Sequence, residues 1–357
     1  MRRRGFLTAL LAGAVAPRLS WADAGSPAIL GAAREADGGY ALFGIAPDGA
    51  DTFRIALPAR GHAAAAHPTA PEAVAFARSP GTFAIVLNCA TGAVLARLHA
   101  PEGRHFYGHG TFIADGDILC TSENDYATGQ GRIGLWSRRD DWRRVGEIPT
   151  HGIGPHEIKR SEGDILVAAN GGYRSHPDQP GIKLDVDRMR PNLSYISPDG
   201  ELLEQVELDA ELRKNSIRHI AFGTRGVVAF GMQWQGDAAD GVPLLGLHRR
   251  GEKPVLDRMP IYEAMAMGGY VGSVAFDAEG MRVAISSPRG GRVQIFDDTG
   301  AHLQTVLRED VCGLAPARRG FFISDGLGGL MQADHDIHAL SKKRGRAWDH
   351  HLVPIAL

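Results

Sequence analysis

The chain has 357 residues, and its 39 Lys and Arg residues nearly balance its 41 Asp and Glu residues, so the formal net charge is −2. This balance excludes the basic footprint expected of a protein that binds nucleic acid or anionic lipid. Glycine is abundant at 46 residues, and aromatic residues make up only 7% of the chain. Short β-rich runs alternate with Gly, Asp and Pro turns, which predicts an all-β array.

The N-terminus has the pattern of an export signal. Residues 2–7 read RRRGFL and contain the R-R-x-F-L core of a twin-arginine signal. An apolar run follows at residues 7–16, and the sequence ADA at 22–24 offers a cleavage site. The apolar run is too short to span a bilayer. We therefore expect residues 1–24 to be removed after export to the periplasm, leaving residues 25–357 as a single domain with no membrane insertion.

The remainder of the chain contains a repeat of four short strands. The clearest copy covers residues 271–306, with turns at 277–280 and 298–300. The same order recurs from His109, His156, His219 and Gly313, and a looser copy starts near His62. Four antiparallel strands are the content of one β-propeller blade. A glycine lies seven residues after the start of five copies, at Gly116, Gly163, Gly226, Gly280 and Gly320.

The two ends of the chain complete a seventh unit. Residues 28–58 supply three strands without a first strand, and residues 351–357 have the pattern of a lone first strand. Pairing this C-terminal strand into the first blade closes a ring and leaves no open sheet edge. The sequence thus predicts an all-β, seven-bladed propeller closed by its C-terminal strand. Six or eight blades remain alternatives, and the blade near His62 is uncertain in register by one residue.

Histidine recurs at one position of this repeat. Innermost strands line the central channel of a propeller, so equivalent residues on them converge on the axis. Imidazole binds Fe, Cu, Zn and Ni, and three or four imidazoles suffice for a site. The pattern predicts an axial site for a transition metal ion or a metal cofactor, and a hydrogen-bonded plug of the channel is the alternative. The first residue of the innermost strand is His351, His62, His109, His156 or His219 in five blades, and Ser273 or Gly313 in the other two.

Residues beside these histidines are candidates for holding the imidazoles in place. Metal-binding histidines need hydrogen-bond partners that set their tautomer and orientation. Glu157 and Arg218 are next to predicted ligands, and His105 is four residues before His109. We expect these three residues to support the site. Cys312, next to Gly313, is a candidate for an additional soft ligand, although a buried free thiol is the alternative.

Several short segments form a distinctive set, which includes HFYGHG (105–110), GPHE (154–157), SIRH (216–219) and WDHHL (348–352). In these segments the sequence resembles domain-of-unknown-function family 1513, and the resemblance covers essentially the whole exported part of the chain. Members of this family look like exported propellers that are often encoded near imelysin-type, iron-regulated proteins. The resemblance therefore implies iron handling and a periplasmic iron-regulated protein as a partner. It implies no role for any single residue.

Three hypotheses about function follow. The first is a periplasmic metal-binding protein in metal acquisition or homeostasis, with iron favoured over copper or zinc. The second is a metal-dependent oxidoreductase that uses the same axial site, by analogy of fold with carotenoid-cleaving oxygenases, which hold iron with four axial histidines. The third is a non-metal scaffold for protein interactions, anchored by exposed aromatic residues, for which Trp136, Trp142 and Trp234 are candidates. The sequence leaves open which metal is bound and whether it is carried by haem.

Overall fold

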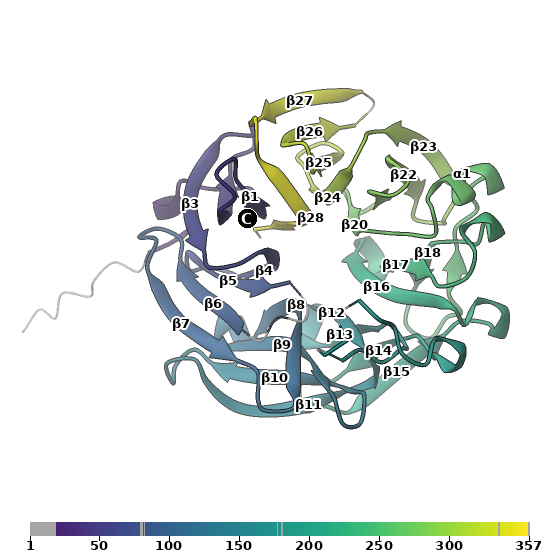
Figure 1. The fold of residues 1–357 in the computed structure, drawn as a ribbon, viewed down its shortest axis with the longest axis horizontal. Coiled ribbons are helices and arrows are strands. Elements are labelled where there is room, and N and C mark those ends of the chain that lie inside the picture. Colours follow the sequence, from purple (N-terminus) through teal and green to yellow (C-terminus); the bar gives the residue numbers. More distant parts are fainter. Residues whose placement is uncertain are drawn as a thin grey trace, which may run out of the picture.

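Seven four-stranded antiparallel sheets surround a central axis in the computed structural model, which confirms the predicted seven-bladed propeller (Figure 1). The structure describes residues 19–355 except 79, 80, 82, 177, 180 and 335. The twin-arginine motif and the apolar run that follows it lie outside the described residues.

Every blade has one innermost strand at the axis and three strands outside it. From the axis outward, blade 1 contains β28 (Ala347–Pro354), β1 (Ile29–Arg34), β2 (Tyr40–Ile45) and β3 (Asp51–Leu57). Blade 2 contains β4 (Gly61–Ala66), β5 (Glu72–Ala77), β6 (Phe83–Asn88) and β7 (Val94–His99). Blade 3 contains β8 (Arg104–Ile113), β9 (Ile118–Asp125), β10 (Gln130–Ser137) and β11 (Arg143–Ile153). Blade 4 contains β12 (Pro155–Arg160), β13 (Leu166–Asn170), β14 (Asn192–Ile196) and β15 (Leu202–Glu207).

The remaining blades follow the same order. Blade 5 contains β16 (Asn215–Phe222), β17 (Val228–Trp234), β18 (Leu245–His248) and β19 (Val255–Leu256). Blade 6 contains β20 (Ser273–Phe276), β21 (Arg282–Ser287), β22 (Arg292–Asp297) and β23 (His302–Leu307). Blade 7 contains β24 (Val311–Pro316), β25 (Phe321–Asp325), β26 (Gly329–Ala333) and β27 (Ile337–Lys342).

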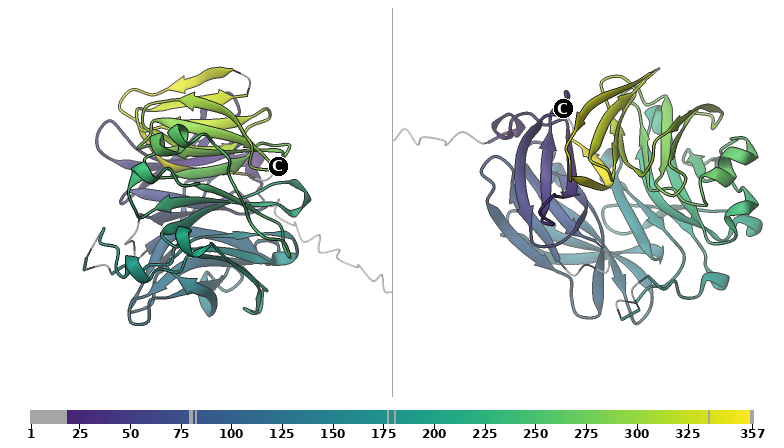
Figure 2. Two further views of the ribbon diagram at one scale, coloured as in Figure 1. Left: turned by 90° about the vertical axis from the view of Figure 1, so that its right-hand side faces the viewer. Right: turned by 45° about the horizontal axis from the view of Figure 1, so that its top comes forward.

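Helical structure is sparse and peripheral. The α-helix α1 (Ile261–Ala266) connects blades 5 and 6 at the outer rim (Figures 1 and 2). Within the part of the chain that the structure describes, no helix has the length and apolar character needed to cross a membrane. Short 3-10 turns are η1 (Trp21–Ala24), η2 (Ala114–Gly116), η3 (Glu162–Asp164), η4 (Val186–Arg188), η5 (Ala210–Leu212), η6 (Thr224–Gly226) and η7 (Ala238–Asp240).

The C-terminal strand closes the ring as the sequence predicts, but it covers Ala347–Pro354 and so begins four residues before His351, the predicted first residue. β28 pairs antiparallel with β1, with Leu352 opposite Gly31 and Ala347 opposite Arg34. Trp348 of β28 is buried and packs edge-on against Phe43 of β2, with ring centroids 5.6 Å apart. The first blade is therefore built from both ends of the chain, and its formation holds the ring together.

The blades are apolar on both faces. Buried residues form seven hydrophobic clusters, one between each pair of neighbouring blades. On β5, Val74 and Phe76 pack toward blade 3, whereas Ala73 and Ala75 pack toward blade 1. Successive side chains of a strand point to opposite faces of its sheet. An inner strand thus has apolar residues at consecutive positions, because both faces are covered.

The repeated glycine has a conformational cause. Gly116, Gly163, Gly226, Gly280 and Gly320 have φ between 65° and 95°. Each lies in the turn between an innermost strand and the second strand of its blade. Glycine adopts this left-handed conformation without the steric penalty of a Cβ atom. The offset of seven residues therefore marks the first turn of the blade, which made the repeat detectable.

The segment just before the predicted cleavage site packs on the propeller. Trp21 of η1 is 7% exposed and donates its Nε1–H to the carbonyl of His67 at 3.0 Å. Trp21 and Ala24 belong to the hydrophobic cluster between blades 1 and 2. The boundary between residues 24 and 25 remains a prediction, and cleavage there would remove these contacts.

We predict that Trp348→Ala destabilises the whole propeller. Removing this buried ring opens a cavity beside Phe43 and should lower the free energy of unfolding by about 3–5 kcal/mol. Thermal unfolding followed by circular dichroism would show a lower Tm. Leu307→Ala is the control, because Leu307 is 69% exposed on the outermost strand of blade 6. Equal Tm values for the two variants would contradict a central role for closure by β28.

Candidate metal centre

The five histidines at the equivalent positions meet on the axis of the propeller. Their imidazole centroids form a closed sequence of 5.0 Å from His62 to His109, 5.0 Å to His156, 4.7 Å to His219, 4.8 Å to His351 and 4.6 Å back to His62. All five are buried. We call these residues the histidine ring.

Blades 6 and 7 contribute no imidazole to the histidine ring. In blade 6, the Ser273 hydroxyl accepts a hydrogen bond from the Leu314 N–H at 3.2 Å. In blade 7, a Cβ atom on Gly313 would lie 2.8 Å from the backbone nitrogen of Leu352. The two positions are therefore used for close packing of β20, β24 and β28.

Irregular strand pairing accompanies each of the five histidines. A β-bulge leaves a residue out of the ladder and redirects side chains near it. The register between the innermost strand and its neighbour is regular in blade 6, where serine replaces histidine, but it shifts between Val311 and Leu314 in blade 7, where glycine replaces histidine. It shifts between Gly61 and Ala64 on β4, Phe106 and Gly110 on β8, Pro155 and Glu157 on β12, Ile217 and His219 on β16, and Trp348 and Leu352 on β28.

One glycine makes the close approach of two ring histidines possible. Gly108 has a φ of 92°, and a Cβ atom there would lie 2.7 Å from Cδ2 of His62. Any other residue would therefore strain the backbone and displace the His62 imidazole. Gly108 belongs to the HFYGHG segment. The sequence alone does not show why glycine is needed there, because the clash is with His62 on a neighbouring strand.

Asp349 orients His62. Its Oδ1 lies 3.1 Å from Nδ1 of His62, and its Oδ2 accepts a hydrogen bond from Nε of Arg60 at 2.6 Å. Arg78 donates to Oδ1 at 3.3 Å. Burial would raise the pKa of Asp349, but His62 and Arg60 hold it well below its usual range. The carboxylate is thus charged. Asp349 was not among the supporting residues expected from the sequence, although it lies in the WDHHL segment.

Glu157 lies between two other ring histidines. Its Oε1 is 3.5 Å from Nδ1 of His109, and its Oε2 is 3.6 Å from Nδ1 of His219. The Ile220 N–H donates to Oε2 at 2.8 Å. Burial would raise the pKa of Glu157, but Lys159 and His109 keep it well below its usual range. A charged carboxylate beside Nδ1 favours the tautomer in which Nε2 is free to bind a metal.

Ring nitrogens remain that have no hydrogen-bond partner. Nε2 of His109, Nε2 of His351, Nδ1 of His156 and Nδ1 of His219 are buried and unpaired among the described residues. Leaving a buried polar atom unpaired is unfavourable, so such atoms call for a ligand. One ligand atom from each member of two groups lies within 4.8 Å of the others, and these groups are His62, His109 and His156, and His109, His219 and His351.

The two groups describe one site. His109 belongs to both, and because its Nδ1 faces Glu157, only its Nε2 is available. Either group would present three imidazole nitrogens to an ion, and His109 would be the ligand common to both.

Burial keeps the imidazoles in the form that binds metals. Desolvation lowers the pKa of His62 to about 3 and that of His219 to about 4, although Asp349 and Glu157 oppose the shift. Desolvation also places the pKa values of His156 and His351 well below their usual range, and nearby histidines add to this effect for both. At neutral pH these side chains are uncharged, and a neutral imidazole is the form that coordinates a metal.

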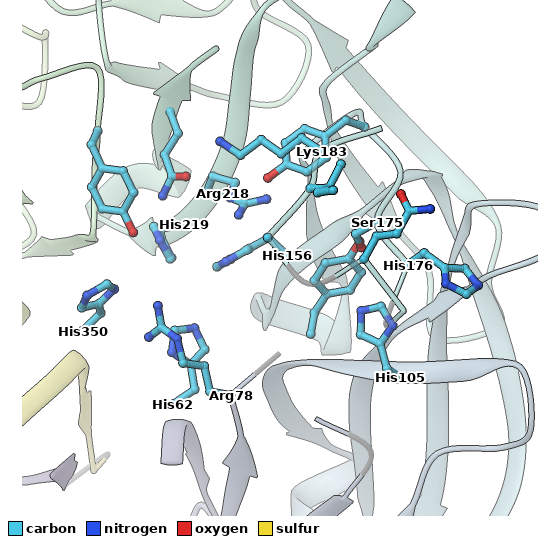
Figure 3. A pocket seen from close by; sticks show the side chains of 17 residues that line it. His62, Arg78, His105, His156, Ser175, His176, Lys183, Arg218, His219 and His350 are labelled. Carbon is cyan, nitrogen blue, oxygen red and sulfur yellow. The ribbon is translucent and has the colours of Figure 1, made fainter. Parts of the chain in front are cut away.

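Arg218 and His105, the other two predicted supporting residues, form no hydrogen bond with the histidine ring. Arg218 precedes His219, and its guanidinium lies 5.3 Å above the ring of Tyr173. His105 stands apart from the ring histidines in Figure 3 and packs against Tyr107 and Tyr126, with centroids 5.0 and 5.3 Å away. Both residues line a cavity next to the histidine ring.

The three cysteines are free, buried thiols. Sγ of Cys312 donates to the carbonyl of Asp310 at 3.1 Å, and Cys312 belongs to neither metal-binding group. Cys89 packs in the hydrophobic cluster between blades 1 and 2, and Cys120 packs in the cluster between blades 3 and 4. The candidate ligands are therefore imidazole nitrogens.

The histidine ring separates two cavities. The first, of about 330 Å³, is lined by His62, His156 and His219 together with Arg218, Lys183 and three tyrosines, and we call it the polar cavity (Figure 3). The second, of about 550 Å³, is lined by His109, His219 and His351 together with residues 63–66, Phe112 and Phe276, and we call it the apolar cavity. An ion held by the ring would be reached from both sides.

The fold and this centre define a class of protein, a seven-bladed propeller with a buried axial histidine cluster able to hold a metal ion. The chain belongs to the family described as "Protein of unknown function (DUF1513)", which matches residues 55–355. No curated protein matches the chain. Among solved structures it is similar to hydrazine synthase of Kuenenia stuttgartiensis, with a TM-score of 0.59 and 12% identity over 95% of this chain and 100% of that chain. At this identity the likeness shows the fold alone.

We predict that Gly108→Ala weakens metal binding about 10- to 100-fold, because the added methyl group displaces His62 from its place beside Asp349. Isothermal titration of the metal-free protein would measure the change. Gly103→Ala is a matched control. Gly103 also has a positive φ, of 75°, but a Cβ atom there meets nothing within 4 Å. If both variants bound metal equally more weakly than the parent, backbone strain and not the displacement of His62 would account for the loss of affinity.

We also predict that the metal-free protein is less stable in acid. In the unfolded chain, His62 and His219 titrate near their ordinary pKa of 6.5, whereas the folded values are about 3 and 4. Between these limits the unfolded state binds more protons, so the free energy of unfolding is largest above pH 6.5 and decreases as the pH is lowered toward about 4. Tm measured from about pH 8 to pH 4 should follow this course.

Variants identify the source of this pH dependence. The double variant His156→Gln, His351→Gln removes two buried imidazoles and should show a shallower decrease of Tm. His99→Gln, on the exposed end of β7, should follow the parent. A double variant as steep as the parent would mean that other groups dominate the acid sensitivity.

Proposed function

We propose that this protein is a periplasmic metal-binding propeller that acts in metal acquisition or homeostasis, with one transition metal ion on the histidine ring. The proposal rests on the different surroundings of the two nitrogen atoms of these imidazoles. Carboxylates of Asp349 and Glu157 face Nδ1 of three of them, while Nε2 of His109 is buried and unpaired. A plug of hydrogen-bonded side chains would leave fewer such atoms without partners.

The choice of metal and compartment rests on separate arguments. An all-imidazole ligand set suits iron, copper and zinc. Iron is favoured only by the resemblance described under Sequence analysis, which implies iron handling because members of that family are often encoded near imelysin-type, iron-regulated proteins. The same association supports a periplasmic iron-regulated protein as a partner. The periplasm is proposed from the twin-arginine pattern of residues 2–7.

A metal-dependent oxidoreductase is the second candidate. It is favoured by the two cavities, because each gives access to one side of the histidine ring and a catalytic metal needs an open coordination position. A bound redox-active metal would supply one-electron chemistry there. The chain's own contribution would be to hold three imidazoles close together and to exclude bulk water by burial.

The interaction-scaffold hypothesis has less support. Trp136 and Trp142 are buried in the cluster between blades 2 and 3, so they are packing residues. Trp234 is partly buried and donates its Nε1–H to Asp240 at 2.8 Å. These three aromatic residues therefore do not form an exposed anchor.

Elemental analysis by mass spectrometry tests the proposal on protein purified from the periplasm without a histidine tag. We expect about one equivalent of metal per chain in the parent and in His99→Gln, whose imidazole is exposed. His109→Gln should lose most of the metal, because His109 belongs to both ligand groups. The triple variant His109→Ala, His156→Ala, His219→Ala should lose all of it while remaining folded by circular dichroism.

The outcome that would overturn the proposal is a metal-free parent that also binds no added Fe²⁺, Cu²⁺ or Zn²⁺. The histidine ring would then be a polar plug of the channel. Exchange kinetics separate the two metal-based candidates. An ion that a chelator removes within minutes fits metal handling, and an ion retained for hours fits a resident catalytic centre.

A further inference from the structure

The polar cavity contains cations without matching carboxylates. Arg78, Lys183 and Arg218 line it, and none of its described lining residues is Asp or Glu. The opposite, apolar cavity differs, since Glu157 and Asp277 are among the residues that line it. An excess of positive charge in a concave site attracts anions from solution.

Two of these cations lack ionic partners among the described residues. Arg218 stacks on Tyr173, and its Nε is buried without a hydrogen-bond partner. Nζ of Lys183 donates to the neutral amide of Gln235 at 2.5 Å. Burial lowers the pKa of Lys183 to about 8, and the positive charges of Arg218 and Arg289 contribute to this decrease. Lys183 and Arg218 therefore repel each other at one wall of the cavity, and Arg289 adds to the positive charge near Lys183.

The opposite wall carries a similar imbalance. Arg78 and Arg60 share the single carboxylate of Asp349, which also contacts His62. One negative charge is thus divided between two guanidinium groups. Figure 3 shows Arg78 beside His62, on the other side of His156 from Lys183 and Arg218. The cavity accordingly has cationic groups at two separated places, with imidazoles between them.

A buried donor without a partner points to the same kind of ligand. His105 is 1% exposed and lines the polar cavity, yet neither of its ring nitrogens has a hydrogen-bond partner in the described part of the chain. Tyr107 and Tyr270 lie on the same lining. A neutral imidazole donates one hydrogen bond, which a carboxylate oxygen accepts well.

We propose that the polar cavity binds a small organic anion with two or more carboxylates, one held by Arg218 and Lys183 and another directed to Arg78. The cavity of about 330 Å³ is of the size that holds small molecules. This inference deepens the proposed function, because the anion would lie against the histidine ring and next to its ion. The cations act without the metal, however, so binding of the anion is testable on its own.

Calorimetric titration of the chelator-treated, full-length exported protein provides the test, with citrate as the probe. We expect saturable binding of one citrate per chain and a rise in Tm. Sodium chloride at matched ionic strength should give neither. Inorganic phosphate should bind at least about tenfold more weakly than citrate, because it has a single anionic group, whereas citrate offers a separate carboxylate to each of the two places.

Matched variants identify the cavity as the site. Arg218→Met, Lys183→Met should weaken citrate binding by at least about tenfold, since each removes a charge-assisted hydrogen bond. Arg213→Met, Lys253→Met removes the same total charge at exposed positions and should bind citrate as the parent does. Circular dichroism and Tm confirm that both double variants are folded.

Three results would overturn the inference. They are the absence of saturable citrate binding, phosphate binding as tight as citrate binding, and equal citrate affinity in parent and Arg218→Met, Lys183→Met. His109→Gln distinguishes this failure from that of the metal site. If His109→Gln loses metal but binds citrate, both proposals stand. If citrate fails to bind the chelator-treated parent while elemental analysis finds metal in the untreated parent, only the anion site is rejected.

Discussion

The pairing of β28 with β1 is the interaction on which the ring and its centre both depend. It joins the two ends of the chain in one sheet. The irregular part of β28 carries Asp349, His350 and His351 to the axis, where Asp349 meets His62 of the next blade. Closure of the propeller and completion of the histidine ring are thus the same event, because one strand supplies the missing blade strand, a ring imidazole and the carboxylate that orients its neighbour.

Burial at the axis has opposite effects on the two kinds of titratable group there. Desolvation keeps the imidazoles of His62 and His219 neutral, whereas Glu157 and Asp349 remain charged because cations and imidazoles surround them. Charged carboxylates and neutral imidazoles are the combination that a metal site requires. The two sides of the centre differ, because cationic groups line the polar cavity and mainly apolar residues line the other cavity.

Much of the fold was predictable because a propeller repeats one local pattern. The turn glycines, such as Gly116 and Gly280, mark the same step of each blade, and the missing first strand implied closure by residues near His351. The bulges were not predictable, since they depend on which residues of neighbouring strands are paired.

The sequence was sufficient for the blade count, the closing strand and the five histidines that share one position, because these follow from spacing along the chain. Which groups support these histidines was decided only by the folded propeller. Asp349 reaches His62 across 287 residues of sequence, and the polar cavity gathers cations from separate blades. Such contacts leave no local pattern, because they depend on the curvature of the ring and on the bulges that aim each side chain toward the axis.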